Sequence, residues 1–179
     1  IMRWVEKQRF KDAGRNAAGL ISYARGQALR TGDVFIVFFD TDAQGAALMD
    51  SGGNPVPVLV LNDGIPGSAN QNCKIDVGEE TRTVRATNGV MWGMANATGK
   101  APSDAGTGDP ASGWTFIDPD TAAASWLLFR PEGTPFSFAP DCDIGDVGSG
   151  AGGIYFTDGD DDQSIIVTPL GAVRVHTWV

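Results

Sequence analysis

The stretch FKDAGRNAAGLISYARGQALRTGDVFIVFF, residues 10–39, decides the fold because it joins an amphipathic helix to a buried strand. Apolar residues recur in its first part at steps of three and four, which marks one face of a helix: Phe10, Ala13, Ala17, Leu20, Ile21, Ala24 and Ala28. Gly32 ends this pattern, where helices favour a left-handed residue. Residues 34–39 are β-branched and aromatic without polar alternation, which predicts a central strand buried on both faces.

The helical pattern extends toward the N-terminus, and we predict one helix over residues 2–31. Polar residues occupy its other face: Arg9, Asp12, Arg15, Asn16, Ser22, Arg25 and Arg30. Three glycines weaken the helix by up to about 1 kcal/mol each relative to alanine: Gly14, Gly19 and Gly26. Its length of about 45 Å exceeds the diameter of a domain of this size. We therefore expect the first turns, with Trp4 and Val5, to project beyond the body.

The remainder of the chain is predicted to be strand and turn. Strands are expected over residues 55–61, 81–87, 114–117, 126–129, 154–157, 164–168 and 172–179. The prolines in the first of these favour an edge position, and residues 95–113, rich in Ala and Gly, favour a surface loop. One long helix followed by antiparallel strands is an α+β fold, with the apolar helix face laid on a sheet. We predict a single domain, 1–179, with the helix in 1–32 and a β-rich head in 33–179.

Composition and charge limit the possible partners. Hydrophobic residues make up 42% of the 179 residues and charged residues 20%, which is typical of a globular chain. Acidic residues number 22 against 13 basic ones, and the net charge of −9 disfavours nucleic acids and anionic membranes as partners. The longest apolar run, residues 34–39, is far shorter than the roughly 20 residues that a membrane-spanning helix needs. The single histidine, His176, excludes sites that require two.

Cys73 and Cys142 leave two alternatives open. Their spacing fits no zinc motif, which needs two close pairs of ligands. They are either two unpaired thiols or a disulfide that closes a loop of about 70 residues. In the chain-entropy model such a loop is worth on the order of 4 kcal/mol, and loop cysteines are favoured in oxidising compartments.

Three stretches carry a resemblance to the GspH/FimT family of minor pseudopilins and minor type IV pilins. The first is SYARGQALRTG, residues 22–32, followed at once by the strand at 34–39. The second is GWTFID at 113–118, and the third combines LFRPEG at 128–133 with IIVTPLGAVR at 165–174. The resemblance implies a pilin-like fold, in which a long N-terminal helix packs on antiparallel sheets.

The resemblance also implies a segment upstream of Ile1. Family members begin with a basic leader, cut by a prepilin peptidase, and about 20 apolar residues that anchor them in the membrane before assembly. We interpret Ile1 as a cut end, so the methylated N-terminal residue and the nearby acidic residue of the family cannot be mapped onto this chain. Residues 45–112 depart from the family pattern and are predicted to form an insertion with its own strands.

The function implied by the resemblance is structural and non-enzymatic. We expect a minor pseudopilin of a type II secretion system, at or near the pseudopilus tip, or alternatively a minor pilin that primes or tips a type IV pilus. The expected partners are other pseudopilins or pilins, through the helix and the head, and the inner membrane, through the upstream segment. The expected location is a periplasmic head on an inner-membrane anchor, or an assembled filament. Arg174 is the sole basic residue in 131–179, which argues against DNA capture.

The candidate chemical sites are few. The acidic turn at 158–162, DGDDD, offers oxygen ligands for calcium, but it lacks the glutamate of an EF-hand and equally suits an empty hairpin tip. Weaker acidic groups are Asp40 with Asp42, and Asp141 with Asp143 and Asp146. His176 has no evident nucleophile to activate. We assign no catalytic, cofactor-binding or metal-ligating residue and expect no cofactor, with calcium left open.

Overall fold

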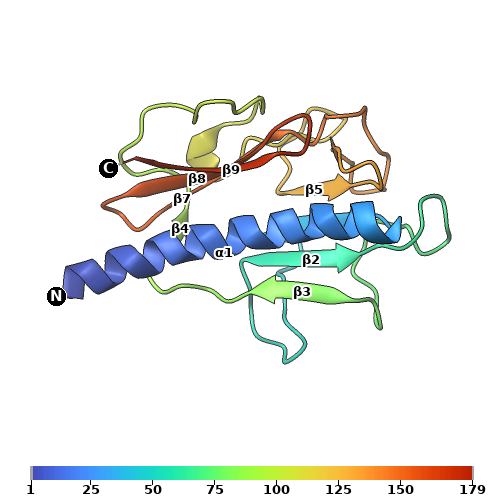
Figure 1. The fold of residues 1–179 in the computed structure, drawn as a ribbon, viewed down its shortest axis with the longest axis horizontal. Coiled ribbons are helices and arrows are strands. Elements are labelled where there is room, and N and C mark those ends of the chain that lie inside the picture. Colours follow the sequence, from blue (N-terminus) through green and yellow to red (C-terminus); the bar gives the residue numbers. More distant parts are fainter. Residues whose placement is uncertain (1, 179) are drawn as a thin grey trace.

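The computed structural model describes residues 2–178 and has an α+β fold, with one N-terminal helix packed on two antiparallel sheets (Figure 1). The helix α1 spans Met2–Thr31, which confirms the predicted bounds. The strands are β1 Phe35–Phe39, β2 Val58–Asn62, β3 Thr81–Val84, β4 Met91–Trp92, β5 Trp126–Phe129, β6 Pro135–Phe136, β7 Gly152–Thr157, β8 Asp162–Val167 and β9 Val173–Trp178, with a short 3₁₀ helix, η1, at Pro110–Ser112.

The first sheet has the strand order β3-β2-β1-β5-β6. All five residues of β1 are buried at its centre, as the sequence predicts. The prediction that 55–61 forms an edge strand was wrong, because β2 lies between β1 and β3. Pro55 and Pro57 precede the first residue of β2, Val58, so their missing N–H groups remove nothing from the strand ladders.

The second sheet has the order β4-β7-β8-β9. The predicted hairpin is confirmed, since β7 pairs with β8 around the acidic turn. The prediction of a strand at 114–117 was wrong, because Trp114 and Ile117 form only isolated bridges, to Ile154 and Ala123 respectively. The chain turns back just after Ile117, where the N–H of Asp118 donates to the carbonyl of Ala122, so no ladder can continue.

The apolar face of α1 packs against both sheets. Ile21, Ala24 and Ala28 are fully buried, and the Phe10 ring meets the Phe156 ring edge-on at 5.5 Å between centroids. The helix lies close to β8 at Gly14, where an added Cβ would collide with the Oε1 atom of Gln163. This close approach explains one glycine of the helix, whereas Gly19 and Gly26 face open space.

The helix also extends past the strands at its N-terminal end (Figure 1). Trp4 there is 67% exposed, as the predicted projection requires. Among residues 2–178, no helix combines the length and the apolar character that crossing a bilayer needs.

A disulfide joins Cys73 to Cys142, which confirms the paired alternative. It ties the predicted insertion, 45–112, to the C-terminal half of the head. The same segment supplies β2 and β3 to the first sheet and β4 to the second, so it is built into both sheets.

Candidate functional site

Arg25 fastens the helix to a turn of each sheet. Its Nε donates to the carbonyl of Gly133, in the β5–β6 turn, at 2.9 Å. Its Nη2 donates to the carbonyl of Leu170, in the β8–β9 turn, at 3.3 Å. Gly171 has φ of +82°, and a Cβ there would collide with the carbonyl oxygen of Gly133 and lie 2.8 Å from the Arg25 Nε. Two of the stretches that carry the family resemblance therefore meet at one side chain.

The second stretch, 113–118, bridges the two sheets. The N–H of Tyr155, in β7, donates to the carbonyl of Gly113 at 2.7 Å, and the N–H of Thr115 donates to the carbonyl of Gly153 at 2.9 Å. The ring of Phe116 stacks on the ring of Phe39, in β1, at 5.9 Å between centroids. All three resemblance stretches thus hold the helix and the sheets in their relative positions.

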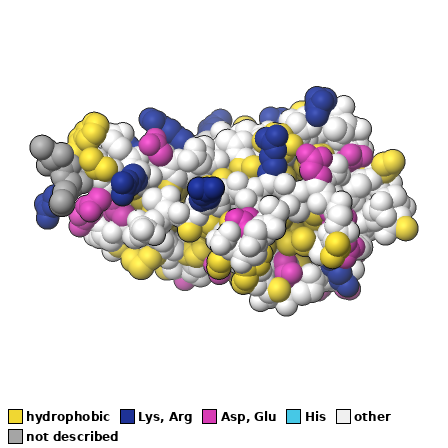
Figure 2. All heavy atoms as spheres, turned by 90° about the horizontal axis from the view of Figure 1, so that it is seen from below, with side chains coloured by type: hydrophobic (Ala, Val, Ile, Leu, Met, Phe, Trp, Pro, Cys, Tyr) yellow, Lys and Arg dark blue, Asp and Glu magenta, His cyan; other side chains and the backbone are white. Residues whose placement is uncertain are grey.

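We call residues 3–9 of α1, whose first turn extends past the strands, the helix end. Phe10 is the first residue of the described helix whose side chain is buried, so the helix end makes little contact with the core. Among the described residues, one ion pair links it to the head, between the Lys7 Nζ and the Asp161 Oδ2 at 3.2 Å. Figure 2 views the molecule from below the view of Figure 1. On the half of this view that carries the helix end, it shows Lys and Arg side chains with several acidic ones among them. The helix end is therefore a surface available to a partner.

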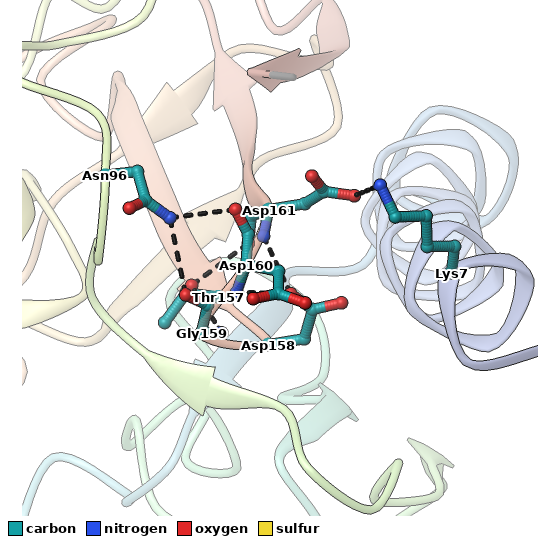
Figure 3. Close-up of polar contacts among 7 residues, drawn as sticks. All are labelled: Lys7, Asn96, Thr157, Asp158, Gly159, Asp160 and Asp161. Atoms are coloured by element: carbon teal, nitrogen blue, oxygen red, sulfur yellow. Dashed lines mark hydrogen bonds and ion pairs between the residues drawn. The ribbon is translucent and has the colours of Figure 1, made fainter. Parts of the chain in front are cut away.

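The carboxylates of the acidic turn at 158–162 have different partners (Figure 3). The Asp158 Oδ1 accepts the N–H groups of Asp160 and Asp161, at 3.0 and 2.8 Å. The Asp161 carboxylate points to Lys7 on the helix, and the side chain of Asn96 reaches across to the Asp160 carbonyl at 2.8 Å. The turn thus serves as a contact between the hairpin, the helix and the segment around Asn96.

Asp162 anchors the start of the predicted surface loop. Its carboxylate is 1% exposed and accepts the N–H groups of three successive residues, Ala95, Asn96 and Ala97. Burial alone raises the pKa of Asp162, but these backbone hydrogen bonds outweigh it and hold the pKa below the ordinary value. Asp162 therefore stays ionised and clamps residues 95–97 onto the second sheet.

Asp104 anchors the same loop further along. Its carboxylate accepts hydrogen bonds from the hydroxyls of Tyr155, at 2.5 Å, and Thr115, at 2.9 Å. Burial and the hydrogen bond to Asp104 raise the pKa of Tyr155 well above its ordinary value. Residues 95–113 do run over the surface as predicted, but two carboxylates fasten them to β7 and β8. Sequence reasoning missed both anchors.

A third buried carboxyl, Asp63, lies beside the disulfide. Its Oδ1 accepts the N–H groups of Cys73 and Asn72, at 3.2 and 3.3 Å. Burial raises the pKa of Asp63 to about 6 despite these hydrogen bonds. A metal ion needs several His, Cys, Asp or Glu side chains close together. Within residues 2–178, one group of three meets this condition: Asp63, Cys73 and Cys142. Because the two sulfurs are bonded to each other, this group is a covalent link rather than a thiolate site.

The other sequence candidates lie apart. Asp40 accepts a hydrogen bond from the Trp92 Nε1 at 3.2 Å, and the Asp141 Oδ1 accepts the N–H of Asp143 at 3.3 Å. His176 pairs in register with Ser164 across β8 and β9, a neighbour that sequence reasoning missed. The Ser164 Oγ is buried without a hydrogen-bond partner among the described residues, so it is not poised as a nucleophile by His176.

The two parts of α1 therefore differ: the helix end is accessible to a partner, whereas the helix from Phe10 onward is fastened to the sheets. The buried polar side chains near them hold segments of the head together. No family model, curated protein or solved structure matches the chain.

Proposed function

We propose that the protein is a non-enzymatic structural subunit, a minor pseudopilin of a type II secretion system that assembles at or near the pseudopilus tip. One observation carries the proposal: the helix is fastened to the head from Phe10 onward, while the side chains of residues 3–9 are exposed or half-buried, with Trp4 67% exposed. A subunit of this shape offers its helix end for packing against neighbours and its head for contacts with neighbouring heads.

Two further observations support this role. The stretches that resemble the GspH/FimT family converge in space, two of them at Arg25, so they behave as one structural unit. The disulfide between Cys73 and Cys142 suits an oxidising compartment such as the bacterial periplasm. An apolar segment upstream of Ile1 would complete the inner-membrane anchor that the resemblance implies.

Site-specific photo-crosslinking tests the proposal. A photoreactive phenylalanine analogue replaces Trp4 or, in a matched variant, Ser22 in the full gene product, expressed beside its secretion apparatus. Both positions are exposed, and they lie five helical turns apart on the same side of α1. We expect the product in the inner-membrane fraction, with crosslinks to other pseudopilins from position 4 and few from position 22. A product that stays in the soluble fraction, or equal crosslinking from both positions, would count against assembly through the helix end.

The alternative is a minor pilin that primes or tips a type IV pilus, with an adhesive or calcium-binding head. Deleting the gene separates the two functions, because loss of secretion with intact pili supports the pseudopilin and the converse supports the pilin. Calorimetry with and without chelator decides whether the acidic turn at 158–162 takes up calcium.

A further inference from the structure

The charge of the molecule is divided unequally between the helix and the head. Residues 2–31 carry seven Lys and Arg against two acidic residues, a net charge of +5. The rest of the chain carries six basic residues against twenty acidic ones, a net charge of −14. The overall value of −9 therefore hides a cationic helix on a strongly anionic head, and such a molecule orients in the field of any charged surface.

The basic side chains of the helix form a stripe. Arg3, Lys7, Lys11 and Arg15 follow one another at steps of four, so they are neighbours along one side of α1. Like charges at this spacing repel and weaken a helix. The fold uses only part of the stripe: Lys7 pairs with Asp161, and Arg15 lies 3.6 Å from Asp12 in an exposed pair.

Trp4 lies within the same stripe. A helical projection at 100° per residue places it between Lys11 and Arg15 in angle, and its side chain is 67% exposed. An indole among cations suits the interface of a bilayer, where the ring sits at headgroup level and the cations meet lipid phosphates. Duplex DNA would meet the cations but keeps its bases stacked on one another, away from the indole.

We propose that the basic stripe, with Trp4, binds the surface of an anionic membrane and turns the acidic head away from it. Acidic groups border one flank of the stripe, where Glu6, Asp158 and Asp160 line a hollow with Arg3 and Lys7. Lys11 and Arg15 lie outside that hollow. The inference concerns residues 3–15 alone and does not rest on subunit assembly, so its failure would leave the crosslinking test above unaffected.

Vesicle co-sedimentation of the 179-residue chain tests the proposal. The vesicles contain phosphatidylcholine alone, or phosphatidylcholine with about one third phosphatidylglycerol. We expect binding to the anionic vesicles at about 0.01 M salt, where the Debye length is about 30 Å, and clear weakening at about 0.15 M, where it is about 8 Å. We expect little binding to the zwitterionic vesicles.

Matched double variants locate the site. Arg3→Gln with Lys11→Gln removes two cations of the stripe, neither of which forms an ion pair among the described residues. Lys74→Gln with Arg174→Gln removes the same charge from the head, at two exposed positions. We expect the first pair to weaken partition about 25-fold, at about fivefold per charge, and the second to leave it unchanged or slightly stronger.

Trp4→Ala separates a membrane from other anions. We expect it to weaken vesicle binding several-fold while leaving weak retention of duplex DNA unchanged. Three results would overturn the proposal: equal binding to both vesicle types, equal losses in the two double variants, or DNA binding as tight as vesicle binding with no effect of Trp4→Ala. Salt-sensitive dimers in light scattering without vesicle binding would instead assign the stripe to the acidic head of a second copy.

Discussion

The two parts of α1 form one continuous helix but differ in burial and in their contacts with the head. From Phe10 to Ala28 the apolar face is buried against both sheets and fastened by Arg25. In residues 3–9 the side chains are exposed or half-buried, and Lys7 supplies an ion pair to the head. The contrast teaches that the fold needs only the second part of the helix, which leaves the first free for a partner.

The largest expected effect compares Phe10 with Trp4. Phe10 is 2% exposed and packs edge-on against Phe156, so Phe10→Ala should cost about 3 kcal/mol through the cavity it leaves. Trp4→Ala should change the free energy of unfolding by no more than about 0.5 kcal/mol, because Trp4 is mostly in solvent. Urea denaturation of both variants measures the difference. Equal losses would mean that the helix end is part of the folded core.

The next effect concerns Arg25. Removing its side chain in Arg25→Ala should cost about 2 kcal/mol, because the carbonyl groups of Gly133 and Leu170 each lose a charged donor. Arg25→Lys should recover only part of this, since one ammonium cannot match the two directions of the guanidinium. Arg9→Ala, at an exposed position of the helix end, is the control and should be nearly neutral. A neutral Arg25→Ala would show that the two turns hold without the helix.

Alanine substitutions at two glycines of the helix should change the free energy of unfolding in opposite directions. Gly14→Ala should destabilise the protein by about 1 kcal/mol, because its Cβ would displace the end of the buried Gln163 side chain and crowd the Phe156 ring at 3.1 Å. Gly19→Ala should stabilise it by about 0.5–1 kcal/mol, because nothing lies near that position and alanine favours the helix. Thermal unfolding of both variants measures the sign. If both stabilised the protein, the Gln163 side chain would have to move aside at little cost.

The last comparison concerns Asp63, whose titration makes the stability of the protein depend on pH. The pKa of Asp63 is raised to about 6 in the folded protein from an ordinary value of 3.8, so the folded state holds an extra proton between these values. The contribution of Asp63 to stability is therefore fully present below about pH 4 and is lost as the pH rises through 6. We expect the stability of the wild type relative to Asp63→Asn to fall between pH 4 and pH 7, because the wild type loses its extra folded-state proton over that range. A constant difference would show that the carboxyl titrates normally.

The sequence was sufficient for the elements that depend on local patterns. The helix bounds, the buried strand β1 and the β7–β8 hairpin followed from apolar periodicity and from turn residues. The place of β2 was mispredicted because Pro55 and Pro57 were counted within the strand, whereas they precede it. The disulfide was one of two open alternatives, since pairing depends on a contact across 69 residues.

The contacts that define the candidate site could not be predicted in the same way. Arg25 meets partners 108 and 145 residues away, and the Asp162 carboxylate accepts from backbone N–H groups more than 60 residues away. A polar side chain on a helix face or at a strand start looks solvated until the fold brings such a donor or acceptor to it. The sequence therefore predicted Arg25 on the polar face of the helix and placed Asp162 in an exposed turn.

The disulfide has a consequence for how the head would carry tension. Cys73 and Cys142 lie 69 residues apart in the chain, and a load applied between the helix and the last strand crosses that interval through the sulfur bridge. The intervening residues then contribute nothing to extension, which removes about 230 Å of contour length at about 3.4 Å per residue. β3, β4, η1, β5 and β6 fall inside this protected loop, while α1, β1, β2 and the β7–β9 strands remain on the loaded path.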